Sequence, residues 1–96
     1  VQSLYGEALL ASGQPSLAVW PLARAIKDPE QLIYAGLLLA RAQGESGSGA
    51  EAIQTATLIL DAHPDNAAAL HLRIKAYLSE SMEKKALEDL DRLEEL

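Results

Sequence analysis

The chain has 96 residues, 49% of them hydrophobic and 23% charged, which is typical of one compact domain with a modest core. The formal net charge of −6 disfavours nucleic acids and anionic membranes, because both would be repelled on average. The absence of cysteine excludes disulfides and thiolate metal sites, but it is compatible with a cytoplasmic or a periplasmic location. Aromatic residues make up only 4% while Ala and Leu are abundant, so we expect helices rather than strands.

Turn-forming residues divide the chain into six segments of helical length. They cluster in ASGQP (11–15), KDPE (27–30), GESGSG (44–49), HPDN (63–66) and LSES (78–81). Candidate N-caps precede four of the segments: Asp28, Ser48 in a capping box with Glu51, Asp65 or Asn66, and Ser81. Gly13 and Gly47 are placed to end helices in the left-handed conformation. No apolar run approaches the ~20 residues of a membrane span, so we expect no membrane insertion.

Similar residues recur every 34 positions along the chain. Three columns of this register are apolar and one holds turn residues: Ala18/Ala52/Ala86, Leu22/Ala56/Leu90, Ala25/Ile59/Leu93 and Gly13/Gly47/Ser81. Four columns in one register indicate an internal repeat whose equivalent helix faces are buried.

A 34-residue unit of two helices resembles the tetratricopeptide repeat family over nearly the whole chain. The third unit matches best, and the residues at the family's packing positions are Leu70, Ile74, Tyr77, Ala86, Leu90 and Leu93, after Pro64. The second unit needs one extra residue in GESGSG, and the first lacks the family's usual large aromatic. The resemblance implies an all-α solenoid, a right-handed superhelix of three antiparallel helical hairpins and six helices. It forms one domain over 1–96, with units of about 1–30, 31–66 and 67–96.

In this family the first helix of each hairpin lines a concave groove, so the resemblance also implies which residues face a partner. They are Ser3, Leu4, Glu7, Leu10, Ala11, Ile33, Gly36, Leu37, Ala40, Gln43, Ala68, His71, Leu72, Lys75 and Leu78. Their mostly apolar character predicts a scaffold or adaptor that binds an apolar or amphipathic peptide or helix of a partner protein. Glu7 would orient the ligand on one side, and His71 with Lys75 on the other. Alternatively, Leu4, Leu37 and Leu72 are stacking residues and the groove is less apolar.

Several specific functions are disfavoured by the residues present. Chaperone-binding members of the family hold a C-terminal carboxylate with Lys, Asn and Arg, but the corresponding positions here are Ser3, Glu7, Leu37, Ala68 and Leu72. Neither histidine has a metal-ligand spacing, the serines occupy caps and turns, and the glycines of 44–49 do not follow a strand. The sequence therefore predicts no enzyme, no metal site and no cofactor. The alternative is a docking or spacer arm of a larger enzyme, or of a secretion or envelope assembly protein, whose activity lies outside these residues.

The Trp20-Pro21 pair interrupts a segment that otherwise has a helical pattern. The 34-residue register places both residues in columns whose other members are polar: Gln54 and Glu88 for Trp20, and Thr55 and Asp89 for Pro21. We therefore expect an unbroken helix with Pro21 on its outer side. Trp20 would either cover an upstream repeat or make a contact on the convex face with a partner or a second copy.

The two ends of the sequence carry apolar residues that lack an obvious neighbour. Leu87 and Leu96 would have nothing beyond them in the last helix, and Val1 begins in the middle of a helical pattern. We therefore expect a fragment of a longer array, or self-association through the terminal helices.

Overall fold

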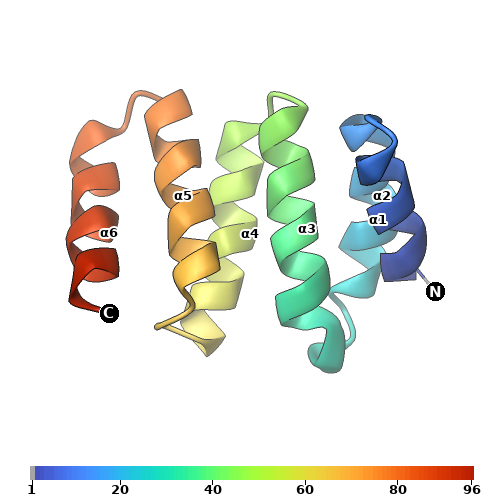
Figure 1. Cartoon of the computed structure of the whole chain (residues 1–96), viewed down its shortest axis with the longest axis horizontal. Coiled ribbons are helices and arrows are strands. Elements are labelled where there is room, and N and C mark those ends of the chain that lie inside the picture. The colour runs from blue at the N-terminus through green and yellow to red at the C-terminus, as the bar shows by residue number, and fades with distance from the viewer. Residues whose placement is uncertain (1) are drawn as a thin grey trace.

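The computed structural model describes residues 2–96, which form six α-helices and one 3-10 turn. The elements are α1 (Gln2–Ala11), α2 (Pro15–Ala25), η1 (Pro29–Gln31), α3 (Leu32–Glu45), α4 (Gly49–Ala62), α5 (Ala67–Ser79) and α6 (Glu83–Glu95). Each α-helix packs against the next, and the three hairpins stack along the 36 Å dimension of the molecule (Figure 1). The predicted all-α solenoid of three antiparallel hairpins is confirmed for these residues. The expectation about Val1 lies outside them.

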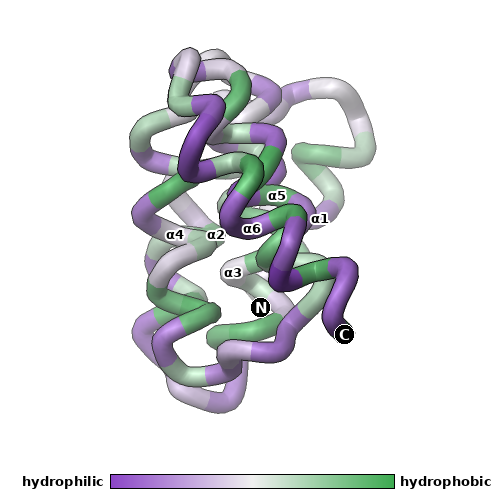
Figure 2. Tube along the Cα trace, turned by 90° about the vertical axis from the view of Figure 1, so that its left-hand side faces the viewer, coloured by the Kyte–Doolittle hydropathy of each residue, from purple (hydrophilic) through white to green (hydrophobic). Residues whose placement is uncertain are grey.

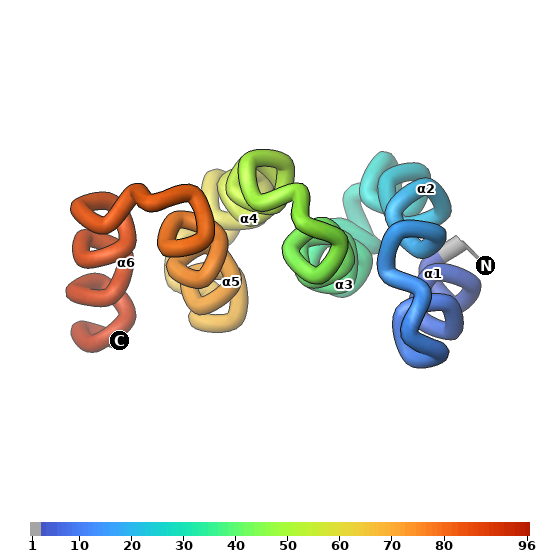
Figure 3. The backbone as a smooth tube through the Cα atoms, turned by 90° about the horizontal axis from the view of Figure 1, so that it is seen from above, coloured from blue at the N-terminus to red at the C-terminus, as the bar shows by residue number. Residues whose placement is uncertain are grey.

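The helices form two rows, which define an inner and an outer side of the stack. Seen from above, α1, α3 and α5 lie on one side, while α2 and α4 lie on the other (Figure 3). Neighbouring helices of the α1, α3, α5 row touch each other, whereas α2, α4 and α6 have no comparable packing among themselves. Because the more closely spaced row lies inside a curved stack, we call the exposed side of α1, α3 and α5 the inner face.

The 34-residue period governs the helix ends. α1, α3 and α5 end at residues 11, 45 and 79, and the following helices begin at 15, 49 and 83, so every hairpin has a three-residue turn. Gly13, Gly47 and Ser81 lie in these turns with φ of +79°, +84° and +60°. The prediction of an extra residue in GESGSG is therefore wrong. The units differ instead in their connections, because residues 26–31 contain the 3-10 turn and residues 63–66 contain none.

The helix starts agree only in part with the predicted caps. The side chain of Asn66 accepts a hydrogen bond from the backbone N–H of Ala69 at 2.8 Å, and Asp28 caps the 3-10 turn through the N–H of Glu30 at 3.0 Å. Ser48 precedes α4 but makes no capping bond, so the predicted capping box is wrong. Ser81 cannot act as the N-cap of α6, because it occupies the left-handed conformation one residue earlier.

The predicted columns form the core, except at its C-terminal end. The side chains of the first two units in these columns are buried: Ala18, Leu22, Ala25, Ala52, Ala56 and Ile59. In the third unit only Ala86 is buried, while Leu93 is half-buried and Leu90 is 39% exposed. Leu90 is less covered because α2 and α4 each pack against two helices, whereas α6 packs closely only against α5 within residues 2–96.

Pro21 is fully buried, which contradicts the prediction that it lies on the outer side of α2. Its column mates Thr55 and Asp89 are also buried, with 5% and 6% of their surfaces exposed. The Thr55 hydroxyl donates to Gln43 Oε1 at 2.7 Å, and Asp89 accepts two bonds from the Arg73 guanidinium, both at 2.7 Å. This column faces the first helix of its own hairpin, where polar groups find partners. The helix does continue unbroken through Pro21, as predicted.

Candidate functional site

The residues predicted to line the groove differ in accessibility. Those with accessible side chains are Leu4, Glu7, Ala11, Ile33, Leu37, Ala68, His71, Leu72, Lys75 and Leu78, with Leu37 and Leu72 half-buried. The remaining five are buried: Ser3, Leu10, Gly36, Ala40 and Gln43. The inner face thus presents about two-thirds of the predicted set to solvent.

For three of the buried residues, internal contacts show that the predicted position in the groove is wrong. Gln43 is only 7% exposed, and its side-chain oxygen already accepts the hydroxyl of Thr55, so it cannot reach a partner. The hydroxyl of Ser3 donates to Gln31 Oε1 at 3.2 Å. Gly36 packs beneath Ile59, whose Cδ1 lies 2.9 Å from the point where a Cβ would stand. Leu10 and Ala40 are 5% and 2% exposed and contribute only to the floors of two pockets.

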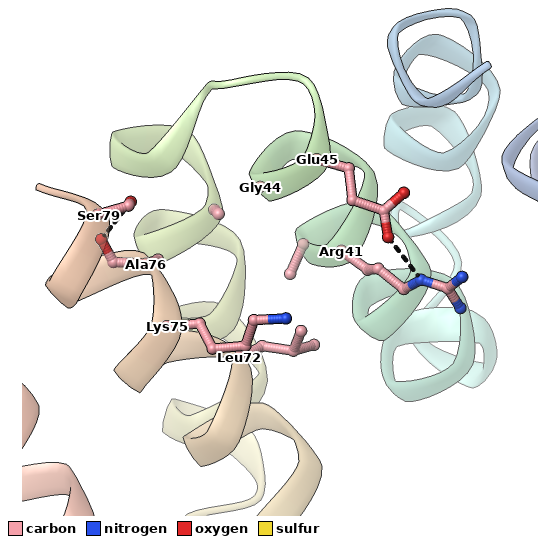
Figure 4. A pocket seen from close by; sticks show the side chains of 9 residues that line it. Arg41, Gly44, Glu45, Leu72, Lys75, Ala76 and Ser79 are labelled. Carbon is pink, nitrogen blue, oxygen red and sulfur yellow. Dashed lines mark hydrogen bonds and ion pairs between the residues drawn. The ribbon is translucent and has the colours of Figure 1, made fainter. Parts of the chain in front are cut away.

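One pocket lies between α3, α4 and α5 and has a volume of about 190 Å³ (Figure 4). Small residues form much of its lining, namely Ala40, Gly44, Ala52 and Ala76. Leu72 and Lys75 enter it from α5, and the ammonium group of Lys75 extends toward α3. Such a lining can take up one apolar side chain and place a charged group at its rim.

The charges around this pocket are only partly paired. Arg41 Nε lies 3.0 Å from Glu45 Oε2 across one turn of α3, with about half of each side chain exposed, so the ion pair contributes little to stability. Lys75 forms no ion pair with any residue within 2–96. The rim of the pocket therefore offers an accessible cation to a partner.

A second, wider pocket of about 550 Å³ lies between α1 and α3. Its walls include Leu4, Glu7 and Leu38, and Arg41 is shared with the first pocket. Glu7 accepts a hydrogen bond of 2.6 Å from the hydroxyl of Tyr34. This bond, together with partial desolvation and the negative charge of Glu7, raises the pKa of Tyr34. The bond also holds the carboxylate of Glu7 in place beside the pocket.

Sequence reasoning missed Arg41, Gly44 and Tyr34 as parts of this surface. The repeat register contained a signal for the first two, because Arg41 shares a column with Glu7 and Lys75, and Gly44 shares one with Leu10. Both partner columns were already assigned to the groove. Tyr34 likewise shares a column with the groove residue Ala68, but its hydrogen bond to Glu7 depends on the rotation of α3 relative to α1.

On the outer face, Trp20 is 61% exposed and the guanidinium carbon of Arg24 lies 5.1 Å from its ring centroid. Its column mates Gln54 and Glu88 are exposed as well. Gln54 belongs to the middle hairpin, which has a neighbour on each side, so an upstream hairpin stacked in the same way would leave Trp20 exposed. A stacking role therefore does not explain Trp20, and a convex-face contact stays a prediction.

Within residues 2–96 there is no cluster of three or more side chains suited to a metal ion. In the same range, no helix combines the length and the hydropathy needed to cross a membrane. The chain matches no family model, and no curated protein is significantly similar to it.

Proposed function

We propose that this chain is a tetratricopeptide-like array that acts as a protein–protein interaction scaffold without catalytic activity of its own. Its ligand would be a peptide or helix of a partner protein bound on the inner face. The observation that carries the proposal is the pair of pockets on this face, both bordered by accessible apolar and charged side chains. The 34-residue period of the helix ends supports the family assignment.

The accessible apolar side chains offer a limited binding surface. Leu4, Ile33 and Leu78 are 66%, 36% and 55% exposed, so covering what remains exposed of each contributes about 0.5–2 kcal/mol. Association also costs translational and rotational entropy, so these side chains favour weak binding of a ligand. We therefore expect a ligand that exchanges readily.

The proposal is tested by measuring partner affinity in inner-face and outer-face variants. A partner is first identified by cross-linking to the full-length protein, and its binding segment is then titrated calorimetrically. Lys75→Glu and Leu78→Asp should each weaken binding at least tenfold. Matched controls away from the inner face are Lys85→Glu on α6 and Leu58→Asp on α4, because both residues are exposed and Leu58, at 51%, resembles Leu78 in accessibility. Equal affinity in the inner-face and control variants would contradict the proposal.

The surface of α6 favours a second role, as a docking or spacer arm in a larger enzyme or assembly. Viewed along the stack from this end, α6 carries hydrophobic segments between hydrophilic ones (Figure 2). Leu87 and Leu96 are 59% and 57% exposed. Self-association or further repeats would cover them, so light scattering of the chain and of Leu87→Asp separates this role from that of a free adaptor. A monomer at all concentrations would argue against self-association.

A further inference from the structure

The two inner-face pockets are copies of one site, displaced by one repeat. Adding 34 to the seven residues that line the α1/α3 pocket gives five that line the α3/α5 pocket. The matching pairs are Glu7/Arg41, Leu10/Gly44, Ala11/Glu45, Leu38/Leu72 and Arg41/Lys75. In each pocket a leucine, Leu38 of α3 or Leu72 of α5, forms an apolar wall. A cation, Arg41 or Lys75, follows one helical turn after that leucine. A linear ligand that presents the same feature twice would meet both pockets at once.

We propose that the two pockets receive two apolar side chains that lie seven residues apart on one amphipathic helix, with an acidic residue against Lys75. This inference rests on the proposed function and specifies its ligand. The three units share a length of 36 Å, so equivalent points are on the order of 10–12 Å apart. Two turns of an α-helix rise about 10.5 Å and return a side chain to the same face.

A helix fits this surface better than an extended peptide does. The walls are helices whose backbone groups are already bonded internally, so they cannot pair with an extended backbone. Side-chain amides could replace such pairing, but Gln43 is buried against Thr55. The side-chain oxygen of Gln31, just before α3, already accepts a hydrogen bond from the hydroxyl of Ser3. A helix brings its own backbone hydrogen bonds and needs only side-chain contacts.

The charges fix the direction of the ligand along the groove. Lys75, at the α5 end, has no ion-pair partner within 2–96, and the neighbouring Arg41 is paired with Glu45. At the α1 end, Glu7 presents a carboxylate that Tyr34 holds in place. An acidic residue of the ligand therefore belongs at the α5 end, and a basic residue at the α1 end.

Gly44 provides a way to close one pocket without disturbing the fold. It lies inside α3, and a Cβ built there meets no atom within 4 Å. The α3/α5 pocket has only about 190 Å³, against about 550 Å³ for its sister, so the side chain of Gly44→Leu would fill it, whereas Leu10 leaves room for a ligand in the wider pocket. Replacing Gly within a helix also removes an entropic penalty of folding, so the variant should keep its Tm or raise it.

The test selects ligands from a phage-displayed library of 20-residue helical peptides on the wild-type chain. Enriched peptides should share an apolar pair at i and i+7 and an Asp or Glu near one member of the pair. Their affinities, measured by fluorescence anisotropy, should fall at least tenfold with Gly44→Leu. They should not change with Gln54→Leu, which adds the same side chain on the outer face. Exchanging the acidic residue of the peptide for Lys should restore binding to Lys75→Glu.

The outcomes separate this inference from the proposed function. Peptides that are weakened by Lys75→Glu and Leu78→Asp but not by Gly44→Leu would overturn the two-pocket model and leave an inner-face scaffold. Peptides insensitive to all three variants would overturn both. Enriched peptides whose apolar residues lie two positions apart, as in extended ligands, would overturn the proposal of a helical ligand. So would a selection in which the wild-type chain enriches no more peptides than Gly44→Leu does.

Discussion

Replacing Asp89 by Asn should destabilise the protein far more than the same change at Asp65. Both aspartates bond to an arginine at nearly the same distance, 2.7 Å from Arg73 and 2.8 Å from Arg92. The side chains of Arg73 and Asp89 are only 19% and 8% exposed, whereas those of Arg92 and Asp65 are 48% and 75% exposed. Hydrogen bonding to Asp89 also raises the pKa of Arg73, so the native state holds the guanidinium firmly as a cation. The two pairs therefore differ in burial, and also in the number of bonds, because Asp89 accepts two bonds from Arg73 whereas Asp65 accepts one from Arg92.

The expected magnitudes differ severalfold. Removing one partner of a fully buried pair costs about 3–5 kcal/mol, because the other charge stays desolvated. Water can still reach part of Arg73, and Asn can still accept one bond, so we expect about 2–3 kcal/mol for Asp89→Asn. The exposed pair should lose at most about 0.5 kcal/mol in Asp65→Asn. Arg73 also donates to Thr57 Oγ1 at 3.2 Å, so the loss extends to the packing of α4 on α5.

Urea unfolding followed by circular dichroism gives both free energies under identical conditions. The double variant Arg73→Met with Asp89→Leu should recover part of the stability lost in Asp89→Asn, because it leaves no buried charge without a partner. If Asp89→Asn and Asp65→Asn fell within 0.5 kcal/mol of each other, the reasoning from burial would be refuted.

Three further substitutions test the turns, the packing and the inner face. Ser81→Gly should raise the free energy of unfolding by about 1 kcal/mol in urea titrations, because Ser81 holds φ at +60°, and no gain would show that the turn is unstrained. Gly6→Ala should cost about 1–3 kcal/mol and lower the Tm, since its Cβ would lie 2.7 Å from Leu22 Cδ2; an unchanged Tm would contradict this packing. Glu7→Gln should lower the pKa of Tyr34 in a spectrophotometric titration, because the carboxylate favours the protonated phenol. The native bond contributes to stability at pH values below the ordinary tyrosine pKa, and the contribution is lost as the pH rises through the raised pKa.

The fold could be predicted because two independent features of the sequence, the apolar columns and the turn residues, repeat with the same 34-residue period. Apolar columns such as Ala18/Ala52/Ala86 mark what is buried, and Gly13/Gly47/Ser81 mark where each hairpin turns. These signals are local, since they depend on helix periodicity and on the conformational freedom of single residues. The alignment with the family's pattern misplaced an extra residue because the first connection contains a 3-10 turn, whose backbone hydrogen bonds leave no distinct mark in residue types.

The site was harder to predict because polarity does not report exposure. The polar character of Thr55 and Asp89 predicts surface positions for them and for Pro21, which shares their column. Both polar side chains are buried instead, because each bonds to a polar residue of the facing helix. The complementary residues Gln43 and Arg73 were visible in the sequence, but pairing them requires the rotation of two helices about their axes. Gln43 was assigned to the groove for the same reason, since a rotation of one residue moves a side chain from the inner face to the core.

The equal turns also determine how the chain can change its length. Because Gly13 and Gly47 occupy the same position of the same three-residue turn, deleting residues 14–47 would join α1 to α4 through an unaltered junction. The contacts of α4 with α5 and of α5 with α6 would be retained, since helices pack mainly against their neighbours in the sequence. The hydrogen bond between Thr55 and Gln43 would be lost, with Leu9 taking the place of Gln43 opposite Thr55. A gene for such a protein can therefore gain or lose whole units by recombination at its turns, and this deletion would have to replace the hydrogen bonds of Thr55 with Gln43 and of Ser3 with Gln31.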